Sequence, residues 1–447
     1  MGARETALLT LDACERQGAW SNAYLKKAIR ADGLDRRDAA LASRLCFGVL
    51  QNKLLLDFYI GKFSTVKPEK LELRVRQALR LGLYQLLFLD KVPERAAVNE
   101  SVSLAKKYSR NPRSAGLVNA VLRSFLRRQD ALPNLEGKDA LETLTIRYSH
   151  PRWLVEALAQ RLASEEAGAD LAEVEALLRL DNEQPPTCAQ VNTLTTTADA
   201  LRSALLEAGA EVRPHPWLNN CLLLSGTGDL EKLDRFQNGD FYVQDAASRL
   251  AVLASGVKAG DRVLDACAAP GGKSFAAAIQ MENKGEVVSC DIHPHKIQLL
   301  EAGAARLGLS CVKAREQNAK TFVQAWEGAF DAVLADVPCS GLGIIRKKPD
   351  IRFKDPKPME QLPTVQREIL ENVSRYVRPG GVLLYSTCTL LRRENEDVVE
   401  RFLAEHPEFA PEPFALPGPA GECGGSITLW PQRHGTDGFF VARMRRK

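Results

Sequence analysis

The chain has 447 residues, a length that fits two or three domains better than one. Hydrophobic residues make up 45% of it and charged residues 26%, which is a globular composition. No apolar run reaches about 18 residues, so we expect no membrane span, and the early acid Glu5 is not typical of a signal peptide. These features predict a globular protein that stays in the cytoplasm.

Ten cysteines are scattered along the chain, and none forms a Cys-x-x-Cys pair. This distribution argues against a disulfide framework and against a structural zinc site. The histidines do not accompany the cysteines at ligand spacing, so we expect no metal, and we expect His293 and His295 to lie at the surface. In a reducing compartment most of the cysteines are then thiols, many of them buried as small apolar residues.

The net charge of +4 hides an uneven distribution. Residues 1–134 contain 24 Lys and Arg against 13 Asp and Glu, a net of +11, whereas the remaining residues contain 36 against 43, a net of −7. A basic N-terminal third indicates a partner that carries phosphates, although Lys and Arg that only solvate helix faces explain the charge equally well.

The first predicted domain, residues 1–134, is all-α. Apolar residues recur at helical spacing in 41–50, 76–87 and 117–126, with almost no β-branched alternation. Residues 131–145 contain Pro133, Asn134 and Gly137 and are a plausible linker.

A small α+β module is predicted over residues 146–235, with strands at 190–193 and 221–224 and a helix at 198–207. Residues 236–447 form the third predicted domain, in which short apolar strands alternate with helices, so we expect a doubly wound Rossmann-like α/β sheet. Its expected strands are 262–266, 286–290, 330–335 and 382–386, and its expected helices begin near Lys273 and cover 295–307 and 364–376.

A glycine-containing loop follows the first strand of this domain and predicts a nucleoside site. Gly271 and Gly272 allow the backbone to approach a ligand, and Asp291, 19 residues beyond Gly272, ends the next strand where an acid can accept hydrogen bonds from ribose hydroxyls. The loop is not a P-loop, because Cys267 occupies the first glycine position, and it is not a dinucleotide fingerprint. S-adenosylmethionine therefore fits better than ATP or NAD, although a tight turn in any Rossmann-like protein would look similar.

Two more cysteines follow the next strands of the same sheet. Cys339 comes after Asp336, and Cys388 lies just past the end of the strand at 382–386, so both thiols should lie with Cys267 at the ligand-binding edge. A thiolate that adds to carbon 6 of cytosine makes carbon 5 nucleophilic enough to accept a methyl group, which is covalent catalysis. An acid such as Asp336 could hold the base. A lone cysteine here would more often be a buried apolar residue, but two beside a nucleoside loop favour catalysis.

The segments 265–273, 336–341 and 386–389 are similar to the motifs of the Sun (Fmu, RsmB) family of RNA cytosine-C5 methyltransferases. Residues 98–102 and 114–122 resemble the NusB-type helical RNA-binding domain that the bacterial members carry. The resemblance implies an S-adenosylmethionine-dependent enzyme, monomeric, that methylates carbon 5 of a cytosine in 16S ribosomal RNA.

The resemblance also implies roles for single residues. Cys388 would be the nucleophile, Cys339 would assist breakdown of the adduct, and Asp336 would lie between cofactor and base. Asp291 would bind the ribose of the cofactor, and Asn318 stands where the family usually has an acid near the adenine. The remaining cofactor-binding residues would be Cys267, Ala268, Ala269, Pro270, Gly271, Gly272 and Lys273.

Basic residues are the candidates for contacts with RNA phosphates, which give affinity and salt dependence. The candidates are Lys106, Lys107, Arg110, Arg113, Arg123, Arg127 and Arg128 in the first domain and Arg346, Lys347, Lys348 and Arg352 after Cys339. Two other hypotheses remain: a non-catalytic RNA-binding factor with a vestigial methyltransferase domain, against which the intact cysteines argue, and an ATPase, which the incomplete P-loop disfavours.

Overall fold

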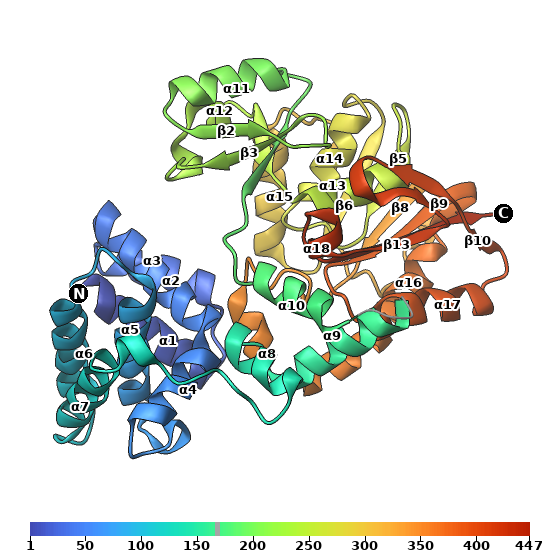
Figure 1. The fold of residues 1–447 in the computed structure, drawn as a ribbon. Helices are drawn as coiled ribbons and strands as arrows, with labels where there is room; N and C mark the ends of the chain where they lie inside the picture. The colour runs from blue at the N-terminus through green and yellow to red at the C-terminus, as the bar shows by residue number, and fades with distance from the viewer. Residues whose placement is uncertain (166–169) are drawn as a thin grey trace. The chain divides into compact units, whose positions relative to one another are not determined.

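The computed structural model describes residues 1–165 and 170–447, and the chain divides into two compact units (Figure 1). The first unit comprises Met1–Glu183 together with Ile345–Lys354. The second comprises Gln184–Ile344 and Asp355–Lys447. Within the described ranges, no helix is long and apolar enough to cross a membrane.

The first unit is helical, as its apolar spacing predicts. The predicted helical stretches 41–50, 76–87 and 117–126 all lie inside observed helices. Its α-helices are α1 (Ala3–Gln17), α2 (Ser21–Ala31), α3 (Arg36–Gln51), α4 (Lys53–Phe63), α5 (Leu73–Phe88), α6 (Glu94–Tyr108), α7 (Ser114–Leu126), α8 (Ala140–Tyr148), α9 (Arg152–Glu165) and α10 (Leu171–Leu180). Residues Ile345–Lys354 add the short 3-10 helix η5 (Pro349–Phe353) to this unit.

Helix α5 is the centre of the helical unit, because it packs against α1, α4, α6 and α7. Helix α5 is buried on nearly all sides. Its residue Arg80 is therefore buried as well, with only 1% of the residue exposed. Two carboxylates compensate the buried guanidinium: Asp57 accepts a bidentate contact at 2.6 and 2.7 Å, and Glu15 accepts one at 2.8 Å. Burial opposes ionisation of Glu15, but Arg80 and Lys53 outweigh it and lower the pKa of Glu15 to about 2. The network therefore joins α1, α4 and α5.

A small antiparallel sheet begins the second unit. Its strand order is β2-β3-β1-β4, and α11 (Ala198–Glu207) and α12 (Asp234–Gln237) pack against it. The predicted strands and helix of this region are observed as β1 (Thr187–Val191), β3 (Cys221–Ser225) and α11, with β2 (Glu211–Pro214) and β4 (Phe241–Val243) in addition. Apolar residues of both layers form one small core, including Val191, Leu201 and Phe241.

The rest of the second unit is a doubly wound sheet, as predicted. Its strand order is β10-β14-β9-β8-β5-β6-β7, with β13 paired to β14. The strands β5 to β9 are parallel, whereas β14 runs antiparallel to β9. The strands are β5 (Arg262–Asp265), β6 (Glu286–Asp291), β7 (Val312–Glu316), β8 (Phe330–Asp336), β9 (Val377–Thr387), β10 (Phe409–Pro411), β13 (Ser426–Leu429) and β14 (Phe439–Arg446); a separate hairpin pairs β11 (Phe414–Leu416) with β12 (Gly421–Cys423).

The parallel strands are buried on both faces, which explains their nearly continuous apolar sequences. Val263 and Leu334 point into one core, whereas Leu264 and Val333, their neighbours along the strands, point into another. Figure 1 shows the helices α14 and α15 in yellow and α16 and α17 in orange around this sheet. The first core is shared with α13 (Ala246–Ser255), α14 (Gly272–Gln280) and α15 (Pro294–Arg306), and the second with α16 (Leu362–Ser374) and α17 (Glu396–Glu405). The remaining α-helix, α18 (Pro431–His434), is a short turn before β14.

The close packing of α5 can be tested at Gly82. A Cβ atom at this position would lie 2.7 Å from Leu122 Cδ1 and 2.9 Å from Ser101 Oγ, so Gly82→Ala should destabilise the helical unit by about 1–3 kcal/mol. Gly116 in α7 is the matched control: no atom lies within 4 Å of its added Cβ, so Gly116→Ala should be neutral or stabilise by up to about 1 kcal/mol. Urea denaturation measures both, and equal effects of the two substitutions would contradict the packing.

Candidate active site

Three loops meet at one edge of the doubly wound sheet. They follow β5, β8 and β9, which are adjacent and parallel, so their carboxyl ends lie together. After β7 the chain returns across the sheet to place β8 on the other side of β5, and the crevice at such a reversal of strand order is where open α/β sheets bind ligands. Sequence and topology therefore place the glycine loop and both thiols at one candidate site.

The loop after β5 has the tight conformation that its glycines predict. Ala268 N–H donates to the carbonyl of Cys290 on β6 at 2.7 Å, and Gly271 N–H donates to the carbonyl of Ala268 at 2.8 Å. The Ala269–Pro270 peptide bond is cis. Gly271 has a φ of +115°, and a Cβ atom there would lie 2.3 Å from the ring of Phe275, so only glycine fits.

The buried acid Asp265 lies directly before this loop and holds the start of the helix that follows it. Asp265, the last residue of β5, accepts a hydrogen bond from Ser274 Oγ at 2.7 Å, and Ser289 on β6 donates to Ser274 at the same distance. The second carboxylate oxygen of Asp265 is buried without a hydrogen-bond partner among the described residues. Burial accordingly raises the pKa of Asp265 to about 6.

The two residues expected near ribose and adenine lie after β6 and β7. Asp291 is buried at the end of β6, where its carboxylate accepts the N–H of His293 at 3.0 Å and the ammonium of Lys296 at 3.3 Å. Asn318 is exposed, and its side-chain oxygen accepts the N–H of Lys320 at 3.0 Å. That oxygen therefore shapes its own turn, while the amide nitrogen makes no such contact with residues 1–165 or 170–447.

The two sulfur atoms after β8 and β9 lie close together. Cys339 Sγ and Cys388 Sγ are 3.2 Å apart, both thiols are half-buried, and the N–H of Gly343 donates to the carbonyl of Cys388 at 2.9 Å. The hydrogen bond with Cys388, together with burial, raises the pKa of Cys339 well above its usual range. Either thiol can be the donor in the hydrogen bond between the two sulfur atoms. Burial likewise raises the pKa of Cys267, which keeps that thiol neutral.

A charged pair lies beside the thiols. Asp336, the last residue of β8, accepts a hydrogen bond from Lys273 Nζ at 2.7 Å and one from Ser386 Oγ at 2.8 Å. The Lys273 side chain is 9% exposed and that of Asp336 is 30% exposed, so the carboxylate keeps an open side. Lys273 was expected only as a cofactor-loop residue, and its partner could not be found from sequence because 63 residues separate the two.

The residue that sequence reasoning missed is Glu394. It is fully buried, and its Oε2 accepts the N–H of Ser340 at 2.9 Å and Gln366 Nε2 at 3.0 Å. Through Ser340 it fixes the loop that carries Cys339. An acid six residues after Cys388 is the signal in the sequence, but it stands among Arg392, Arg393 and Glu396 and looks like part of an exposed charged turn.

The candidate RNA-binding residues of the first domain are all exposed, as expected. Lys107 pairs with Glu5 at 2.5 Å, and Arg123 donates to Asn119 at 2.9 Å. Arg352 is different: it is fully buried within the helical unit, where it donates to Asn182 Oδ1 at 2.8 Å and to backbone carbonyls. The prediction that Arg352 contacts RNA phosphates is therefore wrong. Arg352 is a structural residue that ties Ile345–Lys354 to the helical unit.

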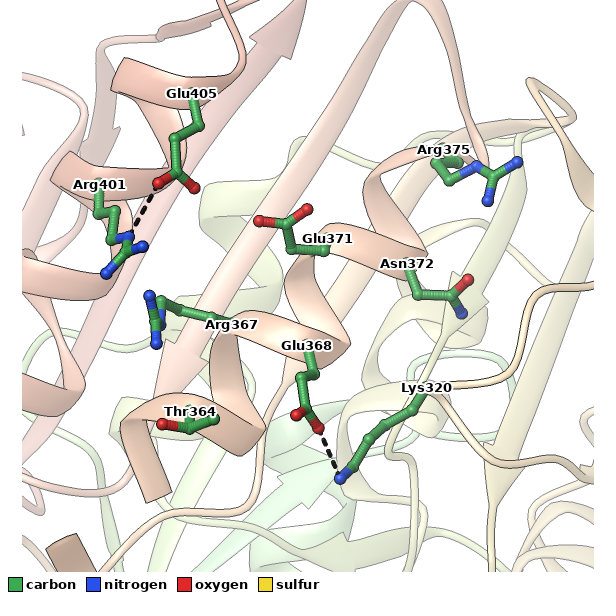
Figure 2. Close-up of a pocket in the computed structure, with 9 residues that line it drawn as sticks. All are labelled: Lys320, Thr364, Arg367, Glu368, Glu371, Asn372, Arg375, Arg401 and Glu405. Carbon is green, nitrogen blue, oxygen red and sulfur yellow. Dashed lines mark hydrogen bonds and ion pairs between the residues drawn. The ribbon is translucent and has the colours of Figure 1, made fainter. Parts of the chain in front are cut away.

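A surface pocket of about 560 Å³ lies elsewhere on the second unit, between α16, α17 and the segment after β7 (Figure 2). Figure 2 shows two ion pairs on its wall, Lys320 with Glu368 at 2.8 Å and Arg401 with Glu405 at 2.9 Å. None of the sequence-predicted site residues lines it. Its mixture of paired charges offers no set of groups for a nucleoside.

No group of three or more His, Cys, Asp or Glu side chains that could hold a metal ion occurs in residues 1–165 and 170–447. His293 and His295 are exposed, as expected.

Comparisons with known proteins match nearly the whole chain. Residues 252–445 match the family described as 16S rRNA methyltransferase RsmB/F, residues 1–127 match the NusB family, and residues 150–231 match the ferredoxin-like domain of RsmF/B-like methyltransferases. The probable ribosomal RNA small subunit methyltransferase B of Bacillus subtilis (strain 168) is 38% identical over 460 residues, which span 99% of this chain and 98% of the relative. The chain belongs to the RsmB/F methyltransferase family.

A further relative and two solved structures are also similar to this chain. The ribosomal RNA small subunit methyltransferase B of Salmonella paratyphi B is 31% identical, over 92% of this chain and 91% of its own. The crystal structure of PH0851 is 27% identical, with a TM-score of 0.80 over 100% of this chain and 99% of that one. NSun6 from Pyrococcus horikoshii shares the fold, with a TM-score of 0.57 at 22% identity over 66% of this chain and 98% of that one. The expected NusB-like, α+β and Rossmann-like methyltransferase architecture is confirmed.

The buried state of Asp265 predicts a pH-dependent stability. The pKa of Asp265 is raised to about 6 in the folded protein, so folding favours the protonated carboxyl. The contribution of this group to the free energy of unfolding is therefore complete below about pH 4 and is lost as the pH rises through 6. The unfolding free energy of wild type relative to Asp265→Asn should therefore fall by up to about 3 kcal/mol between pH 4 and pH 7. Urea denaturation at a series of pH values measures the difference.

The control for this comparison is the exposed Asp130, changed to Asn, whose curve should stay parallel to that of wild type. If the plot of unfolding free energy against pH for Asp265→Asn were also parallel to that of wild type, the pKa of Asp265 would not be raised in the folded protein.

Proposed function

We propose that this protein transfers a methyl group from S-adenosylmethionine to carbon 5 of a cytosine in 16S ribosomal RNA through a covalent adduct with Cys388. The observation that carries the proposal is the 3.2 Å separation of Cys339 Sγ and Cys388 Sγ beside the Asp336–Lys273 pair. Membership of the RsmB/F family supports the RNA substrate, because the relatives at 31–38% identity are named as small-subunit ribosomal RNA methyltransferases. A cytoplasmic enzyme fits the scattered cysteines, none of which forms a Cys-x-x-Cys pair in the sequence.

The loop of residues 267–273 fits the cofactor. Helix α14 begins at Gly272, and its first N–H groups have no partner within the helix, so they suit the carboxylate of the cofactor's methionine part. Asp291 is the acid for the ribose, at the end of the neighbouring strand. Asn318 lies after β7 and is the candidate for the adenine, through its free amide nitrogen. When bound, S-adenosylmethionine supplies the electrophilic methyl group.

The motifs of the family distinguish the roles of the two thiols. Cys388 is the nucleophile: its thiolate adds to carbon 6 of the cytosine, and carbon 5 can then take the methyl group. Cys339 Sγ, 3.2 Å from Cys388 Sγ, is the sulfur close enough to act in the later step. As a thiolate it accepts the carbon-5 proton, the electron pair of that C–H bond restores the ring double bond, and the bond from carbon 6 to Cys388 breaks to release the Cys388 thiolate.

Asp336 and Lys273 hold the cytosine for this addition. The open side of the Asp336 carboxylate can accept hydrogen bonds from the exocyclic amine of the base, while Lys273 and Ser386 fix its orientation. A base paired within a duplex cannot reach the buried thiols, so the target must be unpaired or flipped out. The candidate phosphate-binding residues of the NusB-like domain, Lys106 to Arg128, would supply affinity for the surrounding RNA.

The first experiment measures transfer of tritiated methyl from S-adenosylmethionine to unmodified 16S ribosomal RNA, with the modified base identified by mass spectrometry. We expect one 5-methylcytosine. Cofactor binding without any transfer would contradict the proposal and favour a non-catalytic RNA-binding factor.

The assignment of the two cysteines predicts opposite phenotypes. Cys388→Ala should lower turnover by roughly 10⁴-fold or more, because no adduct forms. Cys339→Ala should instead accumulate protein bound covalently to RNA, because the adduct forms but resolves slowly. Denaturing gel electrophoresis of protein with labelled RNA distinguishes them, and Cys267→Ala serves as a thiol control that should trap no RNA. An RNA-linked band from Cys388→Ala would show that the nucleophile is another residue.

A further inference from the structure

The start of helix α2 presents an exposed aromatic pair. Trp20 precedes the helix and Tyr24 lies one turn further on, with the N–H of Tyr24 donating to the carbonyl of Trp20 at 3.0 Å. Residues four apart share one face of a helix, so the two rings project from the same side. The indole of Trp20 is 52% exposed and Tyr24 is 36% exposed. Large exposed aromatic side chains of this kind mark a surface that binds something.

The segment Ile345–Lys354 completes this surface, because it packs at the same end of α2. Ser21 Oγ donates to the buried carboxylate of Asp350 at 2.6 Å, and Asn22 Nδ2 donates to the carbonyl of Lys347 at 3.4 Å. Lys354 Nζ lies 4.5 Å from the centre of the Trp20 ring. The buried Arg352 anchors the segment to the same unit. The aromatic pair and the segment are therefore held in one fixed arrangement.

Two further cations lie on the same two elements. Lys27 follows Tyr24 by three residues on α2, so their side chains are neighbours on that helix, and Lys348 follows Lys347, whose carbonyl accepts the hydrogen bond from Asn22; both lysines are exposed. Aromatic rings beside cations are the combination that binds unpaired nucleic acid, because the rings stack on bases and the cations contact phosphates. A duplex offers no free base faces for stacking. The segment also continues directly from the loop that holds Cys339.

We propose that Trp20 and Tyr24, together with Lys27 and Lys348, form a binding surface for an unpaired RNA strand. Trp20 stacks on a base, and the lysines contact the flanking phosphates. This inference rests on the proposed function in that the RNA is the substrate of the methyl transfer. The proposed stacking site lies on the helical unit. It is a different site from the exposed basic residues between Lys106 and Arg128, which are candidates for phosphate contacts.

The test compares Trp20→Ala with Trp20→Phe in the full-length protein. Binding of a fluorescently labelled single-stranded RNA is measured by anisotropy in the absence of cofactor, with a duplex of the same sequence in parallel. Trp20→Ala should weaken binding of the single strand by roughly 5- to 100-fold, the range for loss of one base–aromatic stack. Trp20→Phe, which keeps a ring, should recover most of the affinity, and duplex binding should not change.

The matched control is Phe88→Ala, which removes an aromatic side chain that is 37% exposed at the end of α5 in the same unit and should leave RNA affinity unchanged. Changing Lys27 and Lys348 to Gln should reduce the salt dependence of binding without abolishing the effect of Trp20. Wild-type affinity of Trp20→Ala for the single strand would overturn the inference and leave this surface to a protein partner.

This result is separable from the test of the proposed function. With RNA as the varied substrate, Trp20→Ala should raise KM and leave kcat at saturating RNA nearly unchanged, since Trp20 takes no part in the chemistry. If no methyl transfer occurs at all but Trp20→Ala still loses single-strand binding, the proposed function fails and the stacking surface stands. If methyl transfer occurs and KM of Trp20→Ala equals that of wild type, the stacking surface fails alone.

Discussion

The pairing of β8 with β9 is the constraint on which the candidate active site depends. In this parallel ladder Asp336 lies opposite Ser386, so the two strands end together. Cys339 then lies three residues after Asp336 and Cys388 two residues after Ser386, which lets their sulfur atoms approach to 3.2 Å. A shift of the register by one residue would reverse the faces of β9 and separate the thiols. The apolar residues that alternate between the two cores of the sheet prevent such a shift.

Hydrogen bonds at the strand ends turn this alignment into a site with distinct roles. Ser386 and Lys273 hold Asp336, while the buried Glu394 holds the backbone of Ser340. The two thiols share one hydrogen bond, which holds their sulfur atoms 3.2 Å apart. The candidate site therefore draws on groups from four separate stretches of the chain, brought together by the sheet.

In the helical unit, the position of a basic residue in the sequence does not reveal what its side chain contacts. Arg352 lies among Arg346, Lys347 and Lys348, and a cluster of this kind predicts contacts with phosphates. Its guanidinium is instead buried and donates to Asn182 and to the carbonyls of Tyr148 and Asp181. These partners lie about 170 to 204 residues away along the chain, so no local pattern marks them. The same holds for the buried Arg80, whose carboxylate partners Asp57 and Glu15 lie 23 and 65 residues away along the chain.

The sequence by itself determined the local structure and the candidate chemistry. Apolar spacing separated helices from strands, Gly271 and Gly272 marked the loop after the first strand, and the motifs around Cys339 and Cys388 marked the reactive groups. These signals are local, because helix and strand periods and glycine conformations act over a few residues. Only the tertiary structure decided which side chains meet: Lys273 with Asp336, Glu394 with Ser340, and Trp20 with Lys354. Such pairs follow from strand order and helix packing, which depend on contacts between residues far apart in the chain.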